Sequence, residues 1–234
     1  MNTRRISGVN LVALLGEVLR SEDFDLESAL LAWSRFPGRR LVNPLISHLC
    51  SGEEMVKWRA VKALGAVVSH MADEEMEQAR TVMRRLIWSL NDESGGIGWG
   101  APEAMGEIMA DHERLATEFA PILVSYISHD TEDGNPLEHA ILERGVLWGI
   151  GRLAQVHPHL ISNAPRHLSR YLESPDPQHR GLSAWALGYF DAAPFRKKLE
   201  PLLSDGSQIR LFHHAQIHLW RIRDLAARAI GSEK

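Results

Sequence analysis

The sequence contains one cysteine, Cys50, among 234 residues. A single thiol excludes an internal disulfide and a metal cluster built on several cysteines, and it favours a reducing compartment. Long hydrophobic runs are also missing, because no segment approaches the ~20 apolar residues that a membrane-spanning helix needs. The run from Val9 to Leu15 is short and is followed by Glu17 and Arg20. We expect that run to form an amphipathic helix rather than a secretion signal, and we expect a cytoplasmic protein without a membrane partner.

The sequence has no large excess of charge of either sign. The formal net charge is −4 and the pI is near 6.3, with histidine counted as neutral. Proteins that bind nucleic acid usually concentrate Lys and Arg on one face, so this balance argues against nucleic acid as a partner. Hydrophobic residues at 44% and charged residues at 24% are typical of a folded chain, and the length suits one elongated domain.

Patterns typical of β-strands are also scarce. No convincing run alternates polar with β-branched residues, whereas apolar residues recur at helical spacing, as in Leu11, Leu14, Leu15, Val18 and Leu19. Glycine and proline divide the chain into segments of roughly one helix each. The sequence therefore predicts an all-α fold with strands effectively absent.

One eight-residue pattern returns along the chain. It reads WRAVKALG at 58–65, WGAPEAMG at 99–106, RGVLWGIG at 144–151 and GLSAWALG at 181–188. The final glycines, Gly65, Gly106, Gly151 and Gly188, are 41, 45 and 37 residues apart, and LFHHAQIH at 211–218 is interpreted as a degenerate copy. Glycine inside a helix costs about 1 kcal/mol relative to alanine, so its return at one register indicates close approach between helices. Helix pairs at a period of ~30–47 residues are typical of stacked HEAT-type units.

At these positions the chain resembles the HEAT-like repeat proteins, including their shorter bacterial type, over roughly residues 40–231. Asp176 with Arg180, and Asp205 with Arg210, match the family's Asp-to-Arg signature, which implies a ladder of buried ion pairs between repeats. The segments 91–108 and 143–153 also resemble uncharacterised bacterial HEAT-like proteins of about this length, a likeness that implies no activity. The resemblance implies an all-α α-solenoid of about five HEAT-like helix pairs. We expect a single domain over 1–234, with N-terminal capping helices in 1–36 and stacked repeats in 37–231.

The repeat register also separates two faces of each second helix. The residue before each glycine points to the core, whereas the positions seven before, three before and one after the glycine share the opposite face. Nine residues at these positions form the predicted binding face: Trp58, Trp99, Glu103, Glu107, Arg144, Trp148, Arg152, Trp185 and Tyr189.

In HEAT-like solenoids the second helices line the concave surface, so these residues predict one continuous groove. Tryptophan and arginine are common anchors of binding surfaces. We therefore expect partly exposed aromatics and an interaction module that binds a protein or peptide segment in the concave groove. The alternative is that the tryptophans pack beneath the next repeat or a long loop, which leaves no groove.

A second functional class is a HEAT-like enzyme or cofactor-handling lyase acting on a small molecule in the same groove. Glu103 and Glu107 would then serve as acid and base, although such a pair is more often a partner for Arg144 or Arg152 of the next repeat. No nucleophile motif is present, so no catalytic residue is predicted.

No cofactor or metal is predicted either. His214 with His218, and His139 with Glu143, lie four apart on expected helices, but each pair supplies only two ligands. The glycines of the 91–98 loop offer a possible anion nest, and a structural turn that seats Trp99 is the favoured interpretation of that loop.

Overall fold

The computed structural model describes residues 10–91, 98–129 and 134–231. The described helices are α1 (Leu11–Arg20), α2 (Leu26–Trp33), α3 (Gly38–His48), α4 (Glu54–Glu74), α5 (Met76–Leu90), α6 (Ala101–Asp111), α7 (Glu113–Ser125), α8 (Ala140–Ala154), α9 (Ala164–Tyr171), α10 (Pro177–Leu187), α11 (Arg196–Leu199) and α12 (Ile222–Gly231). Short 3-10 turns lie at Pro158–Ile161, Ala193–Phe195 and Glu200–Ser204, and two strands, β1 (Gln208–His213) and β2 (Gln216–Arg221), precede α12. None of these helices is long and apolar enough to cross a membrane.

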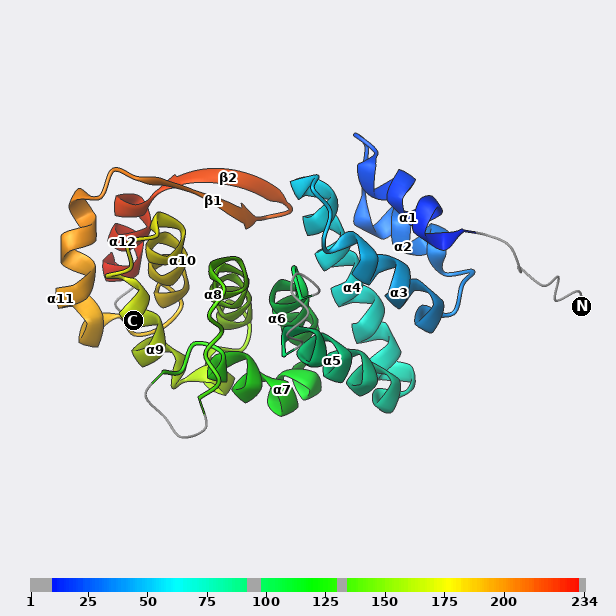
Figure 1. The fold of residues 1–234 in the computed structure, drawn as a ribbon, viewed down its shortest axis with the longest axis horizontal. Coiled ribbons are helices and arrows are strands. Elements are labelled where there is room, and N and C mark those ends of the chain that lie inside the picture. The colour runs from blue at the N-terminus through cyan, green and yellow to red at the C-terminus, as the bar shows by residue number, and fades with distance from the viewer. Residues whose placement is uncertain (1–9, 92–97, 130–133, 232–234) are drawn as a thin grey trace, which may run out of the picture.

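The helices form two stacked rows (Figure 1). The inner row consists of α4, α6, α8, α10 and α12, each of which packs against the next. The outer row consists of α3, α5, α7, α9 and α11, while α1 and α2 pack against α3 and α4 at the N-terminal end. This arrangement confirms the predicted all-α solenoid of about five helix pairs.

Several helices begin at residues whose side chains accept hydrogen bonds from the free amides of the first turn. Asn10 accepts from the N–H of Ala13, and Asp25 accepts from the N–H of Ser28. Asp176 does the same before α10, where Pro177 occupies the first helical position. Gly100 precedes α6 with a φ of +79°, and a Cβ there would lie 2.8 Å from the carbonyl oxygen of Leu49. Local sequence therefore determines where α1, α2, α6 and α10 begin.

The repeated glycines of the inner row permit close helix packing, as predicted. A Cβ added at Gly106 would lie 2.4 Å from the Cα of Gly149, so the backbones of α6 and α8 are in contact. Added Cβ atoms at Gly65 and Gly151 would meet the side chains of Glu107 and Trp185 at 2.7 and 2.2 Å. Gly188 differs, because it ends α10 and has no such close neighbour on another helix.

The prediction that strands are absent is wrong for 208–221. The segment interpreted as a fifth repeat copy forms the antiparallel hairpin of β1 and β2, and the fifth inner helix follows it as α12. His214 and His218 therefore do not share a helix. The two-residue loop places His214 and Ala215 at φ of +49° and +59°, which is the geometry of a type I′ turn. Such turns usually contain Asn-Gly, so this hairpin lacks the common sequence signal.

Candidate functional site

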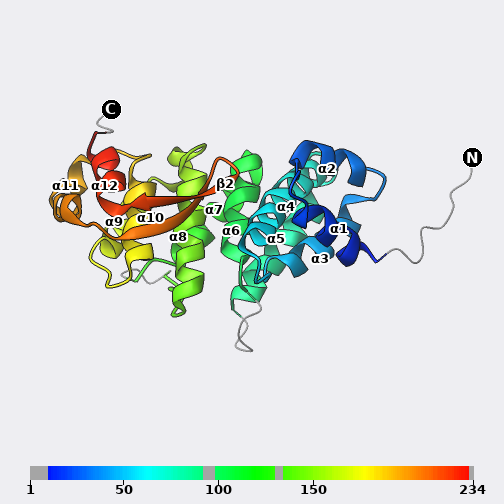
Figure 2. The same ribbon diagram turned by 90° about the horizontal axis from the view of Figure 1, so that it is seen from above.

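The predicted binding residues lie in or next to the inner-row helices α4, α6, α8 and α10, and the hairpin of β1 and β2 lies over that row (Figures 1 and 2). Partial exposure of the aromatics was expected and is wrong for Trp58, Trp148 and Trp185, which are at most 8% exposed. Glu103 and Glu107 are also buried. Trp99 is 40% exposed, and Arg144, Arg152 and Tyr189 are partly exposed. The hairpin lies against Trp58 and Trp148, which explains why these two aromatic side chains are buried.

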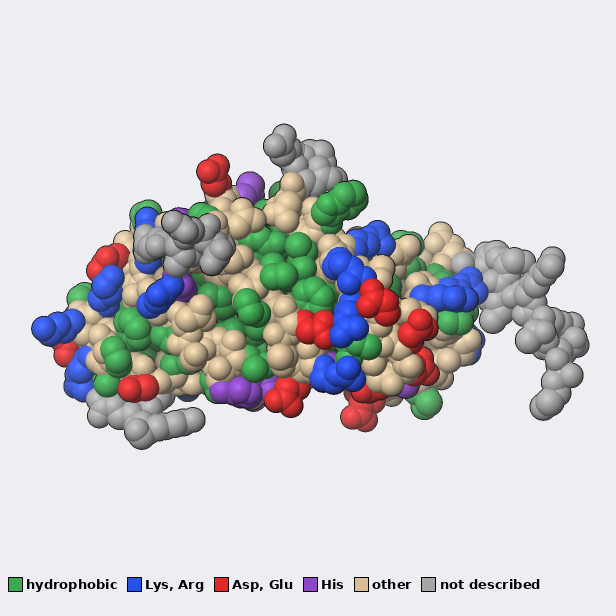
Figure 3. Space-filling view, turned by 90° about the horizontal axis from the view of Figure 1, so that it is seen from below, with side chains coloured by type: hydrophobic (Ala, Val, Ile, Leu, Met, Phe, Trp, Pro, Cys, Tyr) green, Lys and Arg blue, Asp and Glu red, His purple; other side chains and the backbone are tan. Residues whose placement is uncertain are grey.

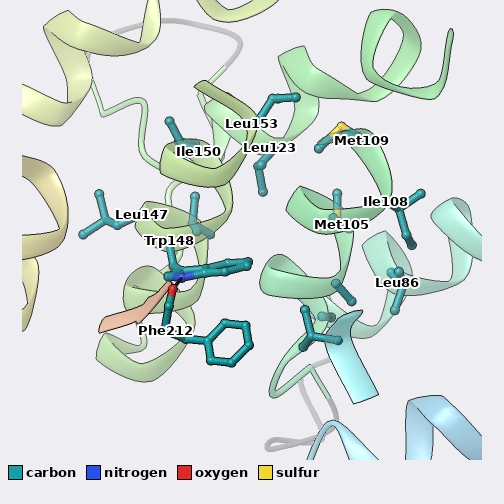
Figure 4. Close-up of a cluster of buried hydrophobic side chains, with 14 of the residues drawn as sticks. Leu86, Met105, Ile108, Met109, Leu123, Leu147, Trp148, Ile150, Leu153 and Phe212 are labelled. Atoms are coloured by element: carbon teal, nitrogen blue, oxygen red, sulfur yellow. Dashed lines mark hydrogen bonds between the residues drawn. The ribbon is translucent and has the colours of Figure 1, made fainter. Parts of the chain in front are cut away.

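Phe212 of β1 anchors the hairpin between two inner helices. Its ring stacks on Trp58 of α4 with centroids 4.7 Å apart and planes 2° from parallel. Trp148 of α8 lies 4.6 Å from Trp58, and its indole N–H donates to the carbonyl oxygen of Phe212 at 2.9 Å. Figure 4 shows Trp148 and Phe212 side by side at the edge of the buried cluster. These contacts place the end of β1 inside the groove.

The backbone of β1 is also held by a side-chain amide. Oε1 of Gln178 accepts from the N–H of Arg210 at 2.8 Å, and Nε2 of Gln178 donates to the carbonyl oxygen of Arg210 at 3.2 Å. The Arg210 guanidinium pairs with Glu54 at the start of α4. Ile209 packs against Gly181, where an added Cβ would lie 2.6 Å from its Cδ1. The inner helices thus hold an extended segment by both its backbone and its side chains.

Buried charges connect the inner helices beneath the hairpin. Glu107 is fully buried and pairs with Lys62 of α4 and with Arg152 of α8, whose Nε donates to it at 3.0 Å. Asp111 accepts from Arg152 at 3.3 Å, and burial together with the Glu107 carboxylate raises the pKa of Asp111. The predicted pairing of these glutamates with the next repeat's arginines is correct for Glu107.

Glu103 behaves differently. Its partner is Lys57, and its second carboxylate oxygen is buried beside Gly145 without a hydrogen bond in the described residues. Arg144 instead pairs with Asp176 at 2.8 Å. The two glutamates therefore belong to separate ion pairs.

Asp–Arg ion pairs join successive repeats. The residues that pair are not the ones that stand four or five positions apart in the sequence signature. Arg144 reaches Asp176 of the following repeat, and Arg180 reaches Asp205 at 2.7 Å. Arg210 leaves the ladder and pairs with Glu54 across the groove. Neither signature pair, Asp176 with Arg180 or Asp205 with Arg210, forms an ion pair with itself, because Arg180 reaches Asp205 and β1 carries Arg210 to Glu54.

A polar cavity of about 200 Å³ lies at the tip of the hairpin. Its walls combine inner-face side chains with the hairpin loop and include Lys62, Glu107, Arg152, Gln155, His213 and His214. Burial, with the neighbouring cationic side chains, lowers the pKa of His213, so its imidazole is neutral at physiological pH. The sequence missed Phe212, Gln178 and His213 because the hairpin had been interpreted as a helix.

Metal-binding geometry is not found in the part of the chain that the structure describes, where no group of three or more His, Cys, Asp or Glu side chains converges. His139 caps α8 by accepting from the N–H of Ile141, and Glu143 accepts from the hydroxyl of Tyr171. Gly95 and Gly96, which the sequence offered as part of either an anion nest or a structural turn, lie outside the described residues.

Comparison with known proteins supports the architecture. No family model matches the chain. An uncharacterized protein of Archaeoglobus fulgidus is 30% identical over 112 residues, which are 48% of this chain and 53% of that relative. The chain therefore matches about half the length of this curated relative.

Two solved structures, of an engineered and of a designed protein, have a similar fold. An engineered protein from the Northeast Structural Genomics Consortium has a TM-score of 0.56 at 16% identity, with 99% of this chain and 95% of that chain covered. A designed armadillo repeat protein in complex with a (KR)4 peptide has a TM-score of 0.50 at 18% identity, with 97% and 100% covered. Fold and comparisons together define an α-solenoid repeat protein whose inner face holds a β-hairpin of its own chain.

Proposed function

We propose that this chain is a protein-interaction scaffold that binds an extended segment of a partner protein along its inner face. One observation carries the proposal: the inner helices already hold β1 as an extended chain. Trp148 and Gln178 hydrogen-bond its backbone, while Trp58 and Gly181 contact its side chains. Backbone contacts of this kind provide affinity for an extended peptide, and pockets for alternate side chains provide specificity.

The predicted binding residues then divide into two groups. Trp58, Trp148 and Trp185, with Glu103 and Glu107, shape the face and position the hairpin from below, because they are buried. Trp99, Arg144, Arg152 and Tyr189 retain exposed surface and are the members of the set that would contact a partner. Aromatic and arginine side chains at such positions are typical of binding hot spots.

A structural neighbour adds a precedent for the architecture. The designed armadillo repeat protein of similar fold binds a (KR)4 peptide. Its identity to this chain is 18%, so the precedent concerns the scaffold rather than the sequence of the peptide. The HEAT-like family, a protein or peptide partner and a cytoplasmic location remain proposals that rest on the sequence.

A direct test is selection of short linear peptides from a display library against the whole chain, followed by amide hydrogen exchange of the complex. We expect selected peptides to slow exchange in β2 and in the exposed parts of α6, α8 and α10. The variant Arg144→Ala on the inner row removes a half-exposed guanidinium, and Arg84→Ala on α5 is its matched control for a general loss of positive charge. Peptides that bind both variants equally and protect only outer helices would contradict the proposal.

A further inference from the structure

The outer edge of β2 is an unpaired strand edge. In the register of the hairpin, Arg210 lies opposite Leu219 and Phe212 lies opposite Ile217. The backbone groups of Arg210 and Phe212 point away from β2, since Gln178 and Trp148 bind them. By the alternation of antiparallel pairing, the N–H and C=O groups of Leu219 and Ile217 point away from β1. Within the described residues no hydrogen bond reaches those groups.

Across the described residues, this edge lacks the lysine, proline, bulge and covering element that most often prevent strand addition. Natural edge strands are protected by lysine, proline, bulges or a covering element. The sequence of β2, Gln-Ile-His-Leu-Trp-Arg, has no lysine or proline, and its pairing with β1 is continuous over six residues. Leu219 is 65% exposed, and Figure 1 shows β2 as the strand farther from the helices. An open apolar edge of this kind pairs readily with another extended chain.

The charges around the edge indicate which chain would pair with it. Residues 206–223 contain three arginines, three histidines and no aspartate or glutamate. Glu54 neutralises Arg210, and Asp224 lies near Arg223. Arg221 is exposed, occupies an outward-directed position of β2 and makes no ion pair with any other described residue. A second copy of this chain would place two cation-rich strands side by side, which is unfavourable. An acidic peptide would instead supply a carboxylate to pair with Arg221.

We propose that β2 recruits an extended acidic peptide segment of another protein as a third strand. The peptide would place an apolar side chain beside Leu219 and a carboxylate beside Arg221. Figure 2 shows the hairpin lying across α8 and α10, so the added strand would run along the mouth of the inner groove. This inference rests on the proposed function and names both the binding position and the chemistry of the partner.

The test measures the affinity of library-selected linear peptides for the whole chain and three variants by fluorescence anisotropy. Leu219→Pro deletes the outward N–H at a position where an edge strand tolerates proline. We expect at least about tenfold weaker binding for Leu219→Pro and a similar loss for Arg221→Glu. Leu219→Thr keeps the N–H and is expected to retain most of the affinity.

N-methylated peptides give a readout that does not depend on folding of a variant. An added strand turns alternate N–H groups toward β2, so methylation at every second residue is expected to abolish binding, while methylation at the intervening residues is tolerated. Peptides that bind Leu219→Pro unchanged and show no such alternation would overturn the inference and leave the proposed function standing. Failure to select any peptide would overturn both. Self-association that Leu219→Pro abolishes would make a second copy the occupant and contradict the inference.

Discussion

The indole N–H of Trp148 donates to the carbonyl oxygen of Phe212 at 2.9 Å and joins residues 64 positions apart. This bond fixes the hairpin to the middle of the inner row. Since Trp148 is 4% exposed, Trp148→Ala is expected to lower the free energy of unfolding by ~3–5 kcal/mol in urea titrations. Trp88→Ala is the matched control, because Trp88 is 82% exposed and should change stability by no more than about 0.5 kcal/mol. Equal effects of the two substitutions would show that the hairpin does not cover Trp148.

Gly106→Ala tests the contact between α6 and α8. The new Cβ would lie 2.4 Å from the Cα of Gly149, and backbone atoms cannot move aside as a flexible side chain can. We expect a loss of roughly 1–3 kcal/mol of unfolding free energy from overpacking. Gly52→Ala serves as the control, since a Cβ there meets nothing within 4 Å. Similar thermal midpoints for both variants would refute the explanation of the repeated glycine.

Glu107→Leu tests the buried charge network. The substitution leaves Lys62 and Arg152 without their shared carboxylate in a partly buried site. Breaking a buried pair in this way is expected to cost about 3–5 kcal/mol. Glu77→Gln removes a mostly exposed carboxylate that pairs with Arg84, and chemical denaturation should show little change in the free energy of unfolding. A Glu107→Leu chain as stable as Glu77→Gln would mean that Glu107 is solvated.

His213 predicts a pH dependence of stability. Burial, followed by repulsion from His214, His218, Arg228 and Arg152, lowers its pKa below the ordinary value of 6.5. The unfolded chain therefore binds a proton more readily than the folded chain, and stability from this residue is lost as pH falls below about 6.5. We expect the free energy of unfolding to decrease between about pH 7.5 and pH 5, and to decrease less in His213→Gln. Identical slopes for the two proteins would remove His213 as the cause.

The sequence predicted the inner row well because its signals are local. Gly65, Gly106 and Gly151 return at one register, and close helix packing explains them without knowledge of distant residues. The same register placed Trp58 and Trp148 on one face, and their rings lie 4.6 Å apart. These features depend on helical periodicity, which a single sequence shows directly.

The hairpin could not be predicted from the same signals. Its loop uses His214 and Ala215 where type I′ turns usually have Asn-Gly, and its burial depends on helices more than 30 residues away. Residues 211–218 also resemble the eight-residue repeat pattern, although they form parts of β1 and β2. Exposure of Trp58 and Trp148 was predicted wrongly for this reason, since the segment that covers them had been assigned to the solenoid itself.

Amide hydrogen exchange of β1 and β2, resolved residue by residue by NMR, tests the central claim most directly. The claim is that the inner face holds β1 as an extended chain and leaves the outer edge of β2 free. The N–H of Arg210 donates to Gln178, whereas the outward N–H of Leu219 has no partner among the described residues. The account predicts slow exchange at Arg210 that accelerates in Gln178→Ala, and fast exchange at Ile217 and Leu219. Fast exchange at Arg210, or protection of every amide from 211 to 218 as in a helix, would contradict it.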